Sequence, residues 1–296
     1  MVLFLREVAE IGCKIANVWR PLEGVARTVE FPDPEKTIEA LYPPNSFKAG
    51  LHLETKREYS GRLHYYPSAG RLWQYALGAY TASSATTPGK LTISSPLPTM
   101  NIESRYKQTN TFTRQWNAIV NRAVWRAEAE GIFEAELELV SKSVSTGSFS
   151  SISGTPPNPI GAYTTTVSLD GTTLATVTRV EVELNNNLET KYYLKGQGNA
   201  NPTDIIDLHR EIRARVTINP EDFTVYDKLL GTGITHSLLI RIERDANNYT
   251  EFSLANGVVR TGSLNIPEAG LVDEEFEIVF RNIEISLKGN FEKPFG

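Results

Sequence analysis

Apolar and polar residues alternate along much of the chain, and this period of two predicts β-strands. The clearest run is residues 131–140, where four apolar residues would face one way and three glutamates the other: Phe133, Ala135, Leu137 and Leu139 against Glu134, Glu136 and Glu138. The preceding segment, residues 121–129, alternates in the same manner, and Glu130-Gly131 is suited to a turn between the two. The two segments therefore predict a β-hairpin.

The second half of the chain is a succession of predicted strands. Residues 180–184 and 211–218 alternate apolar and polar side chains throughout their length. Asp170-Gly171 and Asn256-Gly257 each lie between two further alternating runs, and both pairs favour the positive φ angles of a tight hairpin turn. We therefore expect hairpins at both positions and a mainly β fold.

Helices should be few and short. Four segments have spacing or end signals typical of a helix: residues 6–19, 34–42, 71–78 and 222–231. Cys13 would lie on the apolar stripe of the first of these, where a small buried thiol is more ordinary than a reactive one. The rest of the chain should be strands and loops.

Two gapless internal matches indicate a duplication. Residues 61–80 align with residues 214–233 at an offset of 153, and each copy has the order strand, proline turn, short helix and glycine. Residues 131–140 align with residues 270–279 at an offset of 139. The two matches occur in the same order in both halves, which favours a repeated β domain with a small helix.

A stretch rich in Ser, Gly, Thr and Pro separates the two halves. It covers residues 141–162, where the apolar spacing disappears, and is typical of a linker or a long loop. The chain of 296 residues is long enough for two domains that each bury a core. We therefore predict one domain over residues 1–143, a linker over 144–162 and a second domain over 163–296.

The composition of the chain argues against several classes of function. The net charge of -5 is mild and spread along the chain, so no basic region is suited to sequence-specific nucleic-acid binding. A single cysteine excludes an internal disulfide, and four dispersed histidines offer no metal-ligand spacing. The apolar start MVLFL is too short for a signal peptide or a membrane span, so we expect folding in a cytoplasm.

One cluster of titratable residues could be a catalytic site. Asp204, Asp207, His209 and Glu211 are close in sequence, and a carboxylate beside an imidazole can serve acid–base chemistry. A polar loop that enters a strand explains the same residues, and the chain shows no nucleophile motif or orienting third group. We therefore predict that the protein is not an enzyme and has no catalytic, cofactor or metal site.

Residues 61–230 resemble the tail tube proteins of long-tailed phages and related archaeal viruses. The resemblance is carried in order by LWQYALG, SSPLPTMNIESRY, the hairpin NRAVWRAEAEGIFEAELELV, TTLATVTRVEVELNNNLETKYYL and REIRARVTINPEDFTVYDKLL. The segment VEVELNNNLETKYYL, with Asn187 and Leu188 after a strand, is the most family-like single piece. These are patterns of order and spacing, and they include no catalytic signature.

The resemblance implies two tandem β-sandwich or barrel domains, each with a short α-helix, whose inner sheets join between subunits into a tube. Rings of six subunits, or of three subunits with two domains each, would stack around a channel through which viral DNA passes. The implied partners are further copies of the chain and the tape-measure, tail-terminator and tail-tip proteins, in a virus tail assembled in the host cytoplasm. The alternatives are the tube of a contractile injection system and a β-sandwich surface or adhesion module.

The glutamate stripe is the candidate lining of such a channel. Glu134, Glu136 and Glu138, echoed by Glu275 and Glu277, have the sign of charge that repels DNA phosphates. The alternative is a solvated outer face, because alternating glutamates are an ordinary way to make a strand soluble. Both interpretations remain open from the sequence.

Overall fold

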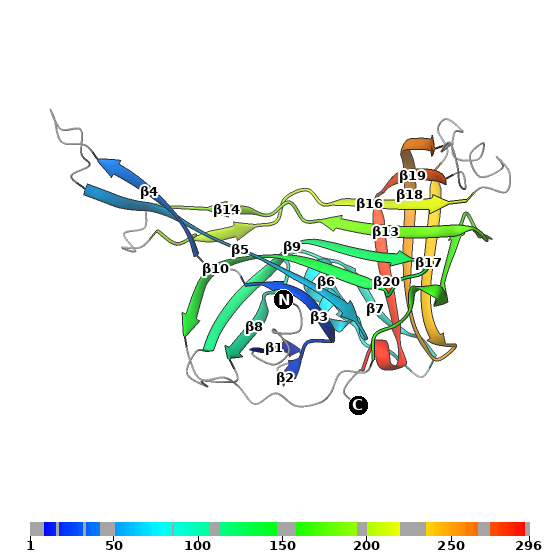
Figure 1. Ribbon diagram of the computed structural model, residues 1–296, viewed down its shortest axis with the longest axis horizontal. Coiled ribbons are helices and arrows are strands. Elements are labelled where there is room, and N and C mark those ends of the chain that lie inside the picture. Colours follow the sequence, from blue (N-terminus) through cyan, green and yellow to red (C-terminus); the bar gives the residue numbers. More distant parts are fainter. Residues whose placement is uncertain are drawn as a thin grey trace.

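The computed structural model is a two-layered β-structure whose sheets do not close into a barrel (Figure 1). It describes residues 9–15, 18–31, 34–41, 51–84, 86–106, 113–146, 158–193, 200–219, 235–265 and 273–293. The long sheet follows the order β3 (Gly24–Glu30), β5 (Leu51–Pro67), β10 (Glu134–Thr146), β9 (Thr113–Glu128), β13 (Val177–Asn185), β16 (Glu211–Ile218), β19 (Asp273–Phe280) and the second part of β18 (Asn248–Asn265). All of these strand pairs are antiparallel.

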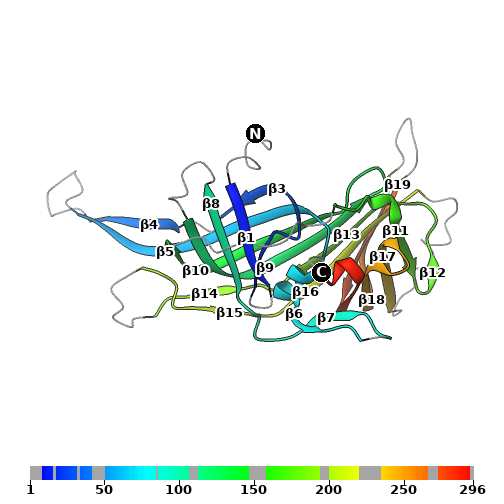
Figure 2. The same ribbon diagram turned by 90° about the horizontal axis from the view of Figure 1, so that it is seen from below.

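A second sheet packs beneath one end of the long sheet and shares β18 with it. Its order is β6 (Gly78–Thr81), β7 (Gly89–Ile93), β20 (Asn282–Lys288), the first part of β18, β17 (His236–Asp245), β11 (Thr165–Leu169) and β12 (Thr172–Thr173). We call it the short sheet. Beneath the other end, β8 (Met100–Tyr106), β1 (Ala9–Ile15) and β2 (Val18–Pro21) continue from the start of β9 (Figure 1). Figure 2 shows β8 and β1 from below.

Two narrow hairpins extend from the long sheet in the same direction (Figure 1). One is formed by β4 (Pro34–Leu41) with the first part of β5, and the other by β14 (Glu189–Lys191) with β15 (Asp204–Ile206). The Arg57 N–H donates to the Ala200 carbonyl at 2.9 Å, and the Tyr192 hydroxyl donates to the Arg57 carbonyl at 2.7 Å. The two hairpins therefore lie side by side.

The helical content is small, as the sequence predicts. One short helix is built from η1 (Arg71–Trp73) and α2 (Gln74–Leu77), and it ends at Gly78, whose φ of 115° suits glycine. The further 3-10 turns are η2 (Ala162–Thr164) and η3 (Gly289–Phe291). The helix predicted at residues 71–78 is confirmed, and the one at 222–231 lies outside the described residues.

Two other predicted helices are wrong. Residues 6–19 include β1 and the start of β2, and residues 34–41 form β4. In the first case Ile11, Cys13 and Ile15 also fit a strand period of two, and pairing with β8 and β2 decides the outcome. In the second, hydrogen bonding to β5 overrides the local helix preference.

The predicted hairpins have mixed outcomes. The turn between β9 and β10 at residues 129–131 is confirmed, as is the tight turn between β11 and β12, where Asp170 and Gly171 have φ angles of 49° and 76°. The hairpin predicted at Asn256-Gly257 is wrong, because β18 continues through both residues without a chain reversal. Asn256 has a φ of 58°, and this bend carries β18 from the short sheet into the long sheet.

The linker begins later than its composition indicates. Strand β10 continues to Thr146 and pairs with β9 up to that residue, so residues 141–146 belong to a strand. The Ser141 hydroxyl lies within hydrogen-bond distance of the Asn117 and Ser143 carbonyls, at 3.0 and 2.9 Å, where the register shifts. Serine-rich composition therefore marks a bulged strand end here rather than a loop.

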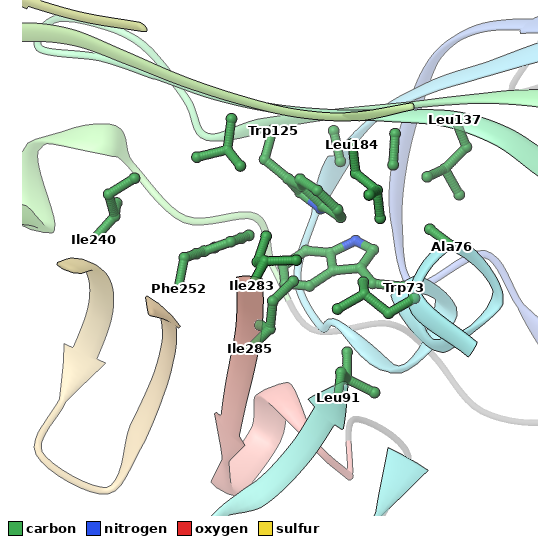
Figure 3. Packing of buried hydrophobic residues seen from close by; sticks show 14 of the residues in the cluster. Trp73, Ala76, Leu91, Trp125, Leu137, Leu184, Ile240, Phe252, Ile283 and Ile285 are labelled. Atoms are coloured by element: carbon green, nitrogen blue, oxygen red, sulfur yellow. The ribbon is translucent and has the colours of Figure 1, made fainter. Parts of the chain in front are cut away.

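The core lies between the two sheets and around the short helix (Figure 3). Trp125 points down from the long sheet, Trp73 lies on the helix side and Phe252 comes from the short sheet; each pair of these rings has centroids 5.4–5.7 Å apart. The Trp73 indole N–H donates to the buried Tyr65 hydroxyl at 3.0 Å. One aromatic cluster thus unites both halves of the chain.

The two sequence matches have the same strand pairing. Leu63 of β5 lies opposite Leu137 of β10, and Val216 of β16 lies opposite Phe276 of β19. Val216 follows Leu63 by 153 residues and Phe276 follows Leu137 by 139 residues, which are the two offsets of the sequence alignment. The repeated segments therefore occupy corresponding places in the long sheet.

Candidate functional site: a charged sheet face and two open edges

The upper face of the long sheet, turned away from the core, carries a row of alternating charges across five neighbouring strands. Directly opposed positions on β10, β9, β13, β16 and β19 hold Glu134, Arg126, Glu181, Arg215 and Glu277. Arg126 Nε lies 2.7 Å from Glu181 Oε2, and Arg215 Nε lies 2.9 Å from Glu277 Oε2. Because opposite charges face each other across strands, we call this row the charge ladder.

The pleat of the strands places these side chains on one face. Figure 3 shows Trp125, Leu137 and Leu184 pointing from the long sheet into the core, and their sequence neighbours must point the other way. Arg126 and Glu183 are two such neighbours. The ladder therefore stands on the surface opposite the hydrophobic core.

Glu181 is the most buried member of the ladder. Its side chain is 7 % exposed, and it contacts Arg126, Arg179 at 3.1 Å and Arg215 at 3.6 Å. Burial acts to raise its pKa, but the hydrogen bonds and charges of Arg126 and Arg179 prevail and lower it. Glu181 is thus held ionised by arginines on three strands.

A second row lies beside the ladder and also crosses from β10 to β13. Arg122 of β9 is held at 3.0 Å by Glu138 on one side and at 2.7 Å by Glu183 on the other. These two carboxylates raise the pKa of Arg122, with Glu183 the larger influence. A guanidinium held by two carboxylates has little capacity left for an outside anion.

The glutamates predicted from the sequence lie together on this face, but four of the five are neutralised. Glu134 pairs with Arg27 at 2.6 Å, Glu136 with Arg62 at 3.2 Å, and Glu138 and Glu277 with the arginines already named. Glu275 is exposed and shows no ion pair within the described part of the chain. The face is therefore a balanced mixture of charges rather than an acidic stripe.

The sequence pattern does not reveal the arginines that pair with these glutamates. The alternation places Arg126, Glu181 and Arg215 on the polar sides of their strands, but it does not show which of these residues meet. The alternation in residues 180–184 and 211–218 already carried the signal. The alternation within a strand does not contain the register that pairs β13 with β9 and β16 with β19.

The long sheet ends in two open edges. Among the described residues, β3 pairs only with β5, and residues 258–265 of β18 pair only with β19. An open edge presents unpaired N–H and C=O groups to another strand. Neither edge is covered by another described strand of this chain.

The junction between the two halves lies in the middle of the long sheet. Strand β9 pairs with β13 from Arg122↔Asn185 to Glu128↔Arg179. The Asn186 side-chain amide donates to the carbonyls of Ala76 and Val120, at 3.0 and 2.9 Å, so the turn after β13 also holds the short helix. The halves are joined by backbone pairing as well as by the core.

The acidic residues of the cluster considered for catalysis each have a separate partner. Asp204 pairs with Lys142 at 2.9 Å, Asp207 accepts from Ser95 at 2.6 Å, and Glu211 pairs with Arg213 at 2.7 Å, while His209 is exposed. The described residues contain no group of three or more His, Cys, Asp or Glu that could hold a metal ion.

Cys13 is buried as the sequence predicts, although on a strand. Burial, with a smaller effect from Glu23, raises the pKa of its thiol to about 12, so it is an unreactive core residue. Within the part of the chain that the structure describes, no helix has both the length and the apolar character needed to cross a membrane.

Comparison with known proteins gives one family. Residues 53–285 match the model of a family described as "Phage tail tube protein", which covers most of the long sheet, the short helix and the short sheet. A search of curated proteins finds no match.

Proposed function

Because the chain belongs to the phage tail tube protein family, we propose that it assembles into stacked rings that form the hollow tube of a virus tail. The family is one of structural virion proteins and not of enzymes. The observation that supports ring formation is the long sheet with an open edge at each end. A cyclic ring in which each copy pairs with the next removes such edges.

In this proposal the ladder face lines the channel. It is the polar face of the long sheet, opposite the core, and it runs without a break across the junction of the two halves. Glu134, Glu136, Glu138, Glu275 and Glu277 would then be luminal.

Transit of DNA requires a wall that does not retain phosphates. Arginines would bind the phosphates, but Arg122, Arg126 and Arg215 are each held by carboxylates at 2.7–2.9 Å. A wall of satisfied ion pairs therefore lets DNA slide without sequence-specific contacts.

The duplication suggests the number of copies in a ring. The two tandem domains, over residues 1–143 and 163–296, would close as a trimer with pseudo-sixfold symmetry. The rings would assemble in the host cytoplasm with tape-measure, tail-terminator and tail-tip proteins. The tube of a contractile injection system has the same requirements for the chain itself.

Negative-stain electron microscopy of the purified protein, with mass measurement of smaller particles, tests the proposal. Hollow tubes with a regular axial repeat are the expected result, and particles of three chains would support the trimer. Six-chain rings would contradict the trimer but not the tube. A stable monomer under all conditions, including addition of preformed tail tips, would overturn ring assembly and favour a surface or adhesion module.

A further inference from the structure

We propose that the β9–β13 junction inside the chain is a copy of the contact between chains, and that it sets the register in which β18 of one copy pairs with β3 of the next. This inference rests on the proposed ring assembly and adds the residues that meet. It requires that β18 correspond to β9 and that β3 correspond to β13. The strand registers test both correspondences.

Strand β18 repeats β9 residue by residue. Ala123 of β9 lies opposite Leu137, and Gly262 of β18 lies opposite Phe276, each pair shifted by 139 residues. Both strands also have a bulge at the same place. The pairing of β9 with β10 skips one residue between Arg122 and Val120. The pairing of β18 with β19 skips one residue between Thr261 and Val259, and these positions lie 139 residues after those in β9.

Strand β3 repeats β13 in the same way, at an offset of 151. The register of β3 on β5 steps from Ala26 to Thr28, and that of β13 on β16 steps from Val177 to Arg179. A bulge adds one unpaired residue to a strand, so a shared bulge position fixes the alignment of two strands without ambiguity. The two correspondences therefore hold to the single residue.

The junction can now be transferred to the open edges. Inside the chain, Glu181 of β13 lies opposite Arg126 of β9, and Val182 lies opposite Trp125. The corresponding residues of the open edges are Glu30 with Asn265, and Phe31 with Leu264. We infer that these two pairs face each other between neighbouring copies.

The contact is head-to-tail, because β3 and β18 are different strands at opposite ends of the long sheet. Such a heterologous contact closes into a ring or continues as a filament, and it cannot form an isolated dimer that satisfies both edges. The partner is therefore a further copy of the same chain, added in one direction.

Cysteine cross-linking measures this register. In the double variant Glu30→Cys with Asn265→Cys, the two Cα atoms would lie within the range of a few ångströms that a disulfide spans. The matched control is Glu30→Cys with Thr261→Cys, in which the second cysteine lies four residues, about 13 Å, further along the same strand. The native Cys13 is buried and gives the background in the unsubstituted protein.

Assembled particles are oxidised and their covalent products are separated without reductant. We expect chains linked into multimers in the first variant and only background in the control. Equal linking in both, or linking in the control alone, would overturn the register. If tubes form but neither variant links, the register is wrong and the tube proposal stands. If no rings or tubes form even from the unsubstituted protein, the tube proposal fails, and this inference with it.

A second pair of cysteines tests the same register at a neighbouring position. Phe31→Cys with Leu264→Cys places the cysteines one step along the same register, on the other face of the strands. Linking of this pair in assembled particles would support the inference independently, and its absence beside intact tubes would overturn it.

Discussion

At the scale of single residues, Glu23 is a buried carboxyl group with a raised pKa. Its side chain is fully buried beside the short helix, where Oε2 accepts the Leu72 N–H at 2.8 Å. Burial raises its pKa to about 8, and the Leu72 N–H and the Arg71 charge offset only part of this effect. With this pKa, the carboxyl group is mostly protonated in the folded protein at neutral pH.

This raised pKa predicts a dependence of stability on pH. The folded state binds the Glu23 proton more tightly than the unfolded state, so the contribution is complete below the unfolded pKa of about 4.5 and is lost as pH rises to about 8. Across this window the free energy of unfolding should fall by up to about 1.4 kcal/mol per pH unit through this group. Urea unfolding of the subunit at several pH values measures the fall.

The Glu23→Gln variant isolates the contribution of this residue. Glutamine can still accept the Leu72 N–H but carries no proton that titrates, so the variant should lose this part of the pH dependence and gain stability at pH 8. An unchanged pH profile in the variant would show that Glu23 ionises normally in the folded protein.

At the scale of elements, the bend in β18 decides how the two sheets are connected. Asn256 has a φ of 58°, which asparagine tolerates and β-branched residues resist. The next residue, Gly257, lies against Phe280 and Ile278 with no room for a side chain. The sequence pair that predicted a turn instead bends a continuous strand.

Substitution at Asn256 tests the importance of this bend. We expect Asn256→Val to lower the free energy of unfolding by about 1–3 kcal/mol, because valine is strained at this φ. Asn256→Gly is the matched control, since glycine adopts the same φ and should change stability far less. Thermal or urea unfolding compares the two, and equal losses would mean that the side chain rather than the backbone angle matters.

The elements predicted from the sequence share one property. Strands β10, β13 and β16 have charged or polar residues on one face and apolar residues on the other, so a period of two identifies them without tertiary information. Strands β1 and β4 have ambiguous spacing, and only their neighbours β8 and β5 determine their structure.

The charged face could be predicted only in part, for a related reason. Its glutamates follow from alternation within one strand, but their partners depend on register between strands far apart in sequence. Arg126 and Glu181 meet because β9 and β13 pair, although 55 residues separate them. The spacing of residues within one strand contains no information about that pairing. The internal repeat, in contrast, did predict which strands of the first half correspond to which strands of the second.

At the scale of the whole molecule, the ladder and the open edges are properties of one sheet. The edges determine how copies join, and the face determines what the joined sheets present to the channel. The repeat places Arg62 opposite Glu138 and Arg215 opposite Glu277. Arg62 pairs with Glu136 at 3.2 Å and Arg215 pairs with Glu277 at 2.9 Å, so each half contributes an arginine held by a glutamate of the next strand. A ring would therefore present these pairs at regular intervals around its wall.

The proposed luminal role of the ladder predicts a contrast between two glutamates. Glu277 holds Arg215 at 2.9 Å and Arg260 at 3.2 Å, whereas exposed Glu275 on the same strand and face shows no ion pair among the described residues. Glu277→Gln should release Arg260 and leave Arg215 with only the more distant Glu181, 3.6 Å away. These guanidinium groups should then bind passing phosphates, and DNA ejection from virions should slow severalfold.

Glu275→Gln is the matched control, because it removes the same charge without releasing an arginine. Its ejection rate should stay close to that of the unsubstituted virion, and both variants should still form tubes, since neither substitution is at an open edge. Raising the ionic strength should restore ejection in Glu277→Gln, because salt weakens binding between arginine and phosphate. If both variants slow ejection equally, net charge rather than the paired arginines controls transit; if neither does, the ladder does not line the channel.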